Sequence, residues 1–254
     1  MSWTKQIYIY CERGSDPAFW AEPVNALTNG AFLVAAGAAF VRLRRKQPHE
    51  RSADHYLLVA IVAAIGTGSF LFHTFATKWA ELADVAPIGI FMLVYMTIAL
   101  STFLKVVPGL SFIGTVAFAG LFYLAGTVKC GTGPLDVGLG GAGTPCLNGS
   151  VGYLPALFAM LIIGWVLRAR RHPAGRLILT AGLVFIVSVT LRSIDKSACA
   201  MASVGNVRIG THFAWHCLNG VTLYLLLRAA IDHWAYGTVQ EILPPRAGTG
   251  RVRT

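Results

Sequence analysis

The sequence predicts an all-α integral membrane protein, a seven-transmembrane-helix bundle with its N-terminus outside and its C-terminus in the cytoplasm. The 254-residue chain is 55% hydrophobic and only 13% charged, whereas a soluble domain carries roughly a quarter charged residues. The apolar residues are gathered into blocks of about 20, the length that crosses a hydrocarbon core of roughly 30 Å. We expect these blocks to be helices, because helices satisfy their own backbone hydrogen bonds in lipid.

The blocks define the predicted elements in their order along the chain. We predict transmembrane helices over residues 24–43, 55–73, 84–104, 110–127, 151–168, 176–192 and 209–231. These seven spans leave no room for a separate soluble domain. The expected organisation is an outward N-terminal segment over 1–23, the transmembrane domain over 24–231 and a basic cytoplasmic tail over 232–254.

The formal net charge of +10 is distributed in groups, and the groups predict the topology. Basic residues follow the first, fifth and seventh predicted spans: Arg42, Arg44, Arg45, Lys46 and Arg51; Arg168, Arg170, Arg171 and Arg176; Arg246, Arg251 and Arg253. Cytoplasmic connections of membrane proteins are enriched in lysine and arginine. The basic residues are therefore expected to orient the protein in the membrane, and nucleic acid is not an expected partner.

The cysteines allow disulfides on the outward side. Cys11, Cys130, Cys146 and Cys199 fall in segments predicted to face outward, whereas Cys217 lies within the last predicted span. Four thiols in an oxidising compartment can form two disulfides in three pairings. Free thiols are the alternative that the spacing leaves open.

Three histidines predict a metal site near the outer membrane surface. His212 and His216 are four residues apart at the start of the last predicted span, so they lie on one helix face. His73 ends the second span, about 27 Å from its inner end, and therefore at a similar depth. Three imidazoles with an open fourth position are the usual ligands of catalytic zinc. The alternative is a set of packing or interfacial side chains without metal.

Polar side chains near His73 would suit hydrolysis. Ser69 lies one helical turn before His73, and its hydroxyl could donate to a developing oxyanion; it could instead form an interhelical hydrogen bond. Asp84 opens the third span, where a carboxylate is costly unless it is used, and it could serve as a general base. Glu81, three residues earlier, is the rival base or a solvated acid. Together these residues predict an intramembrane metallohydrolase.

Acidic residues also precede the first span. Glu12, Asp16 and Glu22 lie within eleven residues of one another, and carboxylates are the hard ligands that calcium prefers. The alternative is an ordinary polar segment beside the membrane. Farther along the chain, Arg192 and Asp195 have the spacing of an i,i+3 ion pair on a helix, and we expect that pair to be structural.

In this order, the residues resemble the alkaline ceramidase family, within a larger group of seven-span membrane hydrolases that includes the progestin and adiponectin receptors. The resemblance covers nearly the whole chain, and the Cys11-Glu12 segment indicates the ceramidase branch. It is carried by these motifs: Cys11-Glu12 with Glu22; Asn25-Ala26-Leu27-Thr28-Asn29; Gly66-Thr67-Gly68-Ser69-Phe70-Leu71-Phe72-His73 with Asp84; Arg192-Ser193-Ile194-Asp195 with Cys199; and His212-Phe213-Ala214-Trp215-His216.

The resemblance implies roles for the residues of the predicted metal site. By this resemblance, His73, His212 and His216 bind the catalytic zinc ion. Asp84 acts as the general base, and Ser69 helps to stabilise the oxyanion. The fold that the resemblance implies is the seven-helix bundle already predicted from the apolar blocks.

The resemblance also implies two features of the N-terminal segment. One is a disulfide between Cys11 and Cys199. The other is a calcium site, for which the candidate ligands are Glu12, Asp16 and Glu22. The segment departs from the family pattern, since Ile9 stands where an acid is expected and Gly14 where an asparagine is expected, and it is about one residue shorter.

We therefore expect a zinc-dependent intramembrane amidase that hydrolyses ceramide or a related N-acyl membrane lipid to a fatty acid and a sphingoid-type base. One alternative is a seven-span lipid receptor or sensor with a structural zinc site. A transporter is a third alternative, disfavoured because the sequence has no internal repeat. The short loops and the Ala/Gly/Arg-rich composition suit a bacterial inner membrane, with the zinc site toward the periplasmic side.

Overall fold

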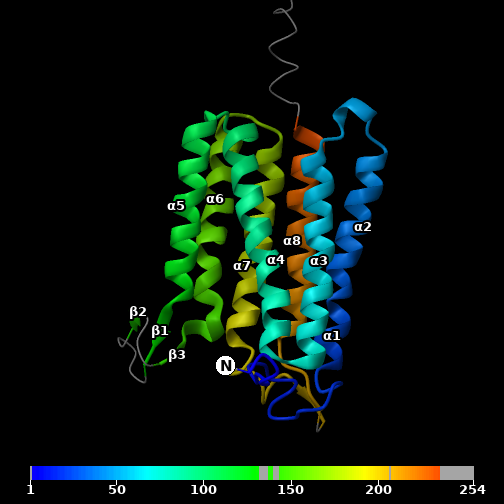
Figure 1. The fold of residues 1–254 in the computed structure, drawn as a ribbon, viewed down its shortest axis with the longest axis vertical. Helices are drawn as coiled ribbons and strands as arrows, with labels where there is room; N and C mark the ends of the chain where they lie inside the picture. The colour runs from blue at the N-terminus through cyan, green and yellow to red at the C-terminus, as the bar shows by residue number, and fades with distance from the viewer. Residues whose placement is uncertain (1, 132–136, 140–142, 206, 235–254) are drawn as a thin grey trace, which may run out of the picture.

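The structure, a computed structural model, describes residues 2–131, 137–139, 143–205 and 207–234 and shows a bundle of long helices (Figure 1). The α-helices of this part of the chain are α1 (Pro23–Thr28), α2 (Gly30–Arg44), α3 (Ala53–Phe75), α4 (Lys78–Ile98), α5 (Pro108–Gly126), α6 (Leu154–Ala169), α7 (Ala174–Ile194) and α8 (His212–His233). Three shorter helical segments accompany them: η1 (Pro48–Glu50), η2 (Ala99–Phe103), which is a π-helical turn, and η3 (Cys146–Tyr153).

The helices fall on all seven blocks predicted from the sequence. Among the described residues, six helical segments are long and apolar enough to cross a membrane, with bounds 23–44, 53–75, 78–103, 108–126, 146–169 and 174–194. These segments are consistent with a multi-pass integral membrane protein. The last helix, α8, packs in the same bundle but is not among the six, so the seventh span and the orientation of the termini stay predictions.

Local sequence explains where the helices begin and end. The Ser52 hydroxyl accepts a hydrogen bond from the backbone N–H of Asp54 at 3.1 Å and caps the start of α3. Proline stands at the first position of α1 and of α5, where its missing N–H costs nothing. Ala76 has a left-handed backbone (φ 48°) that ends α3, and α4 begins two residues later. This tight turn brings the end of α3 and the start of α4 together.

The bundle buries one side of most helices and leaves α5 at its edge. Helix α8 packs against α7 and α2, near the centre of the bundle, while α3 packs against α4 and α6 against α7 (Figure 1). Large apolar side chains of α5 are exposed, among them Leu110, Phe112, Ile113 and Val116. An exposed apolar helix face is what contact with lipid would require.

Two small antiparallel sheets lie in the loops at one end of the bundle, and the sequence did not predict them. One has the order β2-β1-β3 and is formed by β1 (Val128–Cys130), β2 (Val137–Leu139) and β3 (Thr144–Pro145), with Val128 opposite Leu139 and Lys129 opposite Pro145. The other pairs β4 (Ser203–Val204) with β5 (Val207–Arg208). The predicted basic tail lies outside the described residues beyond Trp234.

The two ends of the bundle differ in chemistry. At the end where α8 finishes, the Arg42 guanidinium of α2 pairs with the Asp232 carboxylate through two hydrogen bonds of 2.8 and 2.6 Å. At the end where α8 begins, the N-terminal segment, both small sheets and the three histidines of the predicted metal site are found. The 22 residues of α8 separate these ends by about 33 Å.

Candidate metal centre

The last turn of α3 and the first two turns of α8 bring three histidines together. His73 comes from α3, and His212 and His216 come from α8. Their ring centroids are 5.1 Å (His73 to His212), 4.7 Å (His73 to His216) and 4.6 Å (His212 to His216) apart. One ring nitrogen from each lies within 4.8 Å of the other two, so a single ion could contact all three.

The hydrogen bonding of the three imidazoles is a second, independent indication that they can bind a metal ion. All three rings are buried, and each has one nitrogen with no hydrogen-bond partner among the described residues: Nε2 of His73, Nδ1 of His212 and Nε2 of His216. A buried polar atom without a partner is costly. Three such nitrogens in one cluster are the arrangement that a bound metal ion would satisfy, and imidazole nitrogens suit zinc.

Neighbouring side chains orient two of the rings. Nδ1 of His73 donates to the Glu22 carboxylate at 2.6 Å. Nδ1 of His216 lies 3.0 Å from the Thr28 hydroxyl, whose own hydrogen points to the backbone carbonyls of Val24 and Asn25. A ring that donates through Nδ1 keeps a free lone pair on Nε2. Helix α1 and its N-cap residue, Glu22, therefore supply the contacts that would prepare both rings as ligands.

Asp195 places His212, and the expected ion pair with Arg192 does not form. The Asp195 carboxylate accepts hydrogen bonds from the backbone N–H groups of Thr211 at 2.8 Å, His212 at 3.0 Å and Cys11 at 2.8 Å. The N–H groups of Thr211 and His212 lie at the start of α8 and have no helical partner of their own. Asp195 thus fixes the first turn of α8 and joins it to the N-terminal segment.

Arg192 instead lies beside the histidines, a position that its sequence spacing did not predict. Its guanidinium donates to the carbonyl oxygen of Asn148 at 2.5 Å and to the Ser150 hydroxyl at 3.0 Å. It also lies over the rings of Tyr153 and Trp215, at 5.2 and 5.6 Å. An arginine inside a predicted span is itself a signal of a functional interior, which the pairing with Asp195 obscured.

A small cavity opens beside the histidines. Ser69 and Asp84 line it together with His212, His216 and Arg192. The structure thus brings the predicted serine and carboxylate to the predicted metal ligands, although these residues come from three different helices. The cavity is also lined by Tyr10, whose ring stacks on that of His212 at 3.7 Å between centroids.

Glu81, the alternative candidate for the general base, lines the same cavity. Its charged neighbour is different from that of Asp84. The Asp84 carboxylate interacts with His73 and with the Ser69 hydroxyl. The main charged partner of Glu81 is Lys78, at the start of the same helix. These neighbours favour Asp84 as the carboxylate that serves the histidine cluster.

A second, apolar cavity adjoins the first. Ile88 and Tyr153 line both cavities. Other lining residues are mostly aliphatic or aromatic, such as Phe91 and Met160. A polar cavity that continues into an apolar one suits a ligand with a polar group and a hydrocarbon chain.

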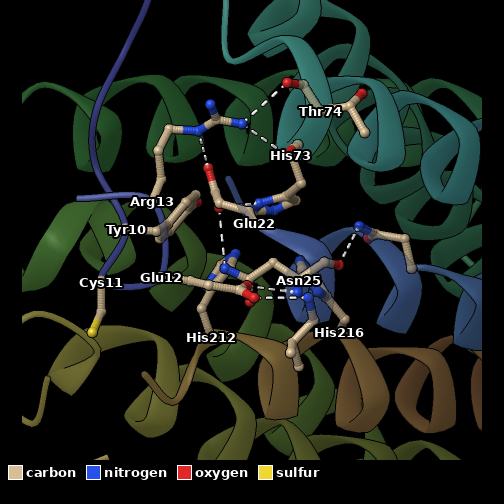
Figure 2. A network of polar contacts seen from close by, with 12 residues as sticks. Tyr10, Cys11, Glu12, Arg13, Glu22, Asn25, His73, Thr74, His212 and His216 are labelled. Atoms are coloured by element: carbon tan, nitrogen blue, oxygen red, sulfur yellow. Dashed lines mark hydrogen bonds and ion pairs between the residues drawn. The ribbon is translucent and has the colours of Figure 1, made fainter. Parts of the chain in front are cut away.

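Among the described residues, the predicted calcium ligands are not gathered into a metal-binding cluster. Both Glu12 oxygens accept backbone N–H groups at the start of α1, from Val24 at 2.7 Å and Asn25 at 2.8 Å. Asp16 is exposed, and its carboxylate accepts the backbone N–H of Ala18. Glu22 contacts His73 and the Arg13 guanidinium (Figure 2). The three carboxylates are thus engaged separately, and their arrangement gives calcium no support.

The surroundings of the two buried glutamates shift their titration in opposite directions. Burial by itself would raise the pKa of Glu22, but neighbouring His73, Arg13 and Asn25 outweigh it and hold that pKa below its usual value. Burial raises the pKa of Glu12, despite the backbone N–H groups that it accepts. Glu22 is therefore the carboxylate that these contacts keep ionised beside His73.

Two disulfides tie the loops at this end of the bundle, as the sequence allowed. Cys11 pairs with Cys199 and Cys130 pairs with Cys146, while Cys217 is free. The first bond holds the N-terminal segment, with Tyr10 and Glu12, against the loop that precedes α8. The second closes the glycine-rich loop after α5.

Comparison with known protein families identifies the family of this chain. The family model described as Ceramidase matches residues 10–235, which covers the helical bundle and the histidine cluster. A search of curated proteins finds no match to this chain.

Proposed function

Because the chain belongs to the ceramidase family, a family of amide-bond hydrolases, we propose that it is a zinc-dependent intramembrane amidase that cleaves ceramide or a related N-acyl lipid. The products are a fatty acid and a sphingoid-type base. The observation that carries the proposal is the cluster of His73, His212 and His216, with their unpartnered nitrogens, beside a cavity that Ser69 and Asp84 line.

The three histidines are the residues that would hold the zinc ion. They are neutral ligands, so a bound ion would keep its full charge. When bound, zinc polarises a carbonyl oxygen and lowers the pKa of a water molecule toward about 7. Glu22, the N-cap residue of α1, and Thr28, its last residue, support the ligands by holding Nδ1 of His73 and of His216.

Asp84 is the residue that we assign to proton transfer. Its carboxylate accepts a proton from the attacking water, whose oxygen forms a bond to the amide carbon. When the carbon–nitrogen bond breaks, Asp84 returns that proton to the departing nitrogen, which leaves as a free amine. The Ser69 hydroxyl donates a hydrogen bond to the carbonyl oxygen as negative charge develops there.

The paired cavities favour a lipid amide over a water-soluble one. In this proposal the acyl chain enters the apolar cavity, while the amide and hydroxyl groups of the substrate reach the polar cavity beside the histidines. A shallow apolar groove between α5 and α6 shares Met96, Phe118 and Ala159 with the apolar cavity. We propose that lipid reaches the site through this side of the bundle.

The location follows from the distribution of basic residues. We propose a multi-pass protein of a bacterial inner membrane, with the basic end of the bundle in the cytoplasm. The histidine cluster and both disulfides then face the periplasm, which is an oxidising compartment.

The test is fatty acid release from a panel of ceramides and other N-acyl lipids by the purified protein in detergent, with metal content measured on the same sample. We expect stoichiometric zinc and cleavage of at least one lipid, both abolished in His216→Ala. His55→Ala is the matched control, because His55 is a buried histidine of α3 outside the cluster. Zinc without cleavage of any lipid would favour the receptor-like alternative, and no zinc would refute the three-histidine site.

A further inference from the structure

Arg13 is buried at the centre of the contacts between the N-terminal segment and the metal centre. Its side chain is 0% exposed and makes five hydrogen bonds. Figure 2 shows those to Glu22, His73 and Thr74. Nε donates to the Glu22 carboxylate at 2.6 Å. The two terminal nitrogens donate to backbone carbonyl oxygens of four residues: Asp16, Ala18, His73 and Thr74. One guanidinium thus joins the N-terminal segment to the end of α3.

Glu22 connects Arg13 to His73, a predicted metal ligand. One of its oxygens accepts from Arg13, and the other accepts from Nδ1 of His73 at 2.6 Å and from the Asn25 side chain at 3.1 Å. A buried carboxylate needs a compensating cation to remain charged. Arg13 supplies that cation and at the same time fixes which way the carboxylate faces.

A divalent cation would have to replace Arg13 rather than join it. Calcium takes six to eight oxygen ligands, but both oxygens of Glu12 are used by backbone N–H groups and Asp16 points to solvent. The remaining carboxylate, Glu22, is already paired with the guanidinium. The positive charge of Arg13 in this position would also repel calcium.

We propose that Arg13 is a positioning residue of the metal centre. Its guanidinium acts as an internal cation that holds Glu22 against Nδ1 of His73, and it makes the site independent of calcium. The inference rests on the proposed zinc ligands but not on the identity of the lipid. A planar five-donor group is required for the observed bonds, so lysine is not an equivalent replacement.

The experiment compares zinc affinity among full-length variants, measured by competition with a chelator. Loss of a side chain that orients a metal ligand weakens metal binding by about 10–100-fold, so we expect a loss of this size in Arg13→Met. Arg13→Lys keeps the positive charge but lacks the planar group of five donors. Its zinc affinity should therefore lie between those of Arg13→Met and the wild type. The control is Arg42→Met, which removes a partly exposed ion pair with Asp232 at the opposite end of the bundle and should leave zinc affinity unchanged.

A calcium titration of the wild-type protein tests the second half of the proposal. After dialysis against EGTA, calcium chloride up to about 1 mM, the weak end of protein calcium sites, should change neither the Tm nor the zinc affinity. A calcium-dependent rise in either quantity would overturn the proposal, as would tight zinc binding by both Arg13 variants. If Arg13→Met does not fold, Arg13→Lys and this titration still decide.

These outcomes are separable from those of the proposed function. Wild-type protein that binds zinc but cleaves no lipid would refute the amidase and leave the role of Arg13 intact. Wild-type affinity in Arg13→Lys and Arg13→Met would refute the role of Arg13 and leave the amidase intact. Wild-type protein without zinc would refute both.

Discussion

Gly68 of α3 lies against the backbone of α4 at Asp84. A Cβ atom built on Gly68 would be 3.1 Å from the Asp84 backbone nitrogen and would overlap the carbonyl oxygen of Ala83. That carbonyl has no helical partner four residues on, because Pro87 lacks an N–H. The missing side chain of Gly68 therefore allows α3 and α4 to approach closely where Ser69 and Asp84 face the same cavity.

Gly68→Ala should displace Asp84 and lower kcat. The added methyl group meets backbone rather than a flexible side chain, so α4 must move. A displacement of about 1 Å in a reacting group can reduce the rate about 10²-fold, while overpacking costs about 1–3 kcal/mol of stability. The measurements are kcat, zinc content and Tm. Gly89→Ala on α4 is the control, because nothing lies within 4 Å of its Cβ position; equal effects of both changes would contradict this account.

Asp84→Asn should abolish most turnover while zinc remains bound. The amide cannot accept the proton of the attacking water, and losing a general base typically reduces the rate about 10²–10⁴-fold. The measurements are lipid cleavage and zinc content of the same preparation. Glu81→Gln provides the comparison, since Glu81 lines the same cavity. A larger loss in Glu81→Gln than in Asp84→Asn would reverse the assignment of the base.

The two disulfides should differ in their effect on the metal centre. Replacing Cys11 and Cys199 with serine frees the segment that carries Tyr10 and Glu12, so both the Tm and the zinc affinity should fall. Replacing Cys130 and Cys146 opens a loop away from the histidines and should lower only the Tm. A native disulfide typically stabilises by about 2–5 kcal/mol. Equal zinc affinity in the two double variants would contradict the prediction.

Filling the apolar cavity should change the preferred acyl chain. Ala156 lines this cavity, and Ala156→Phe would occupy space that a hydrocarbon chain needs. We expect kcat/KM for long-chain substrates to fall about tenfold relative to short-chain substrates. Ala119→Phe is the control, because Ala119 lines a separate groove on the outer face of the bundle. An unchanged ratio in Ala156→Phe would show that the chain binds elsewhere.

Much of the fold could be predicted from the sequence, because its determinants are local. Apolar blocks of sufficient length predict helices in lipid, and the described helices coincide with those blocks. Boundaries such as Ser52 and Pro108 follow from capping and from the geometry of proline. The spacing of His212 and His216 likewise predicts a shared helix face.

Contacts between distant segments could not be predicted in this way. The Arg192–Asp195 spacing predicted an ion pair, but Asp195 accepts backbone N–H groups from two other segments and Arg192 enters the cavity. The N-terminal acids predicted a calcium site, but Arg13, a neighbour in sequence that gave no signal, pairs with Glu22. The partners of a long side chain depend on which segments the folded chain brings next to it.

The sequence by itself thus determined the helical bundle, the family resemblance and the candidate zinc ligands, since each depends on residue type and spacing along the chain. Only the tertiary structure decided which atoms meet: the unpartnered nitrogens of His73 and His216, the Glu22 contact that orients His73, and the close approach at Gly68. The physical reason is that burial and hydrogen bonding act through space, between helices whose mutual positions no local pattern encodes.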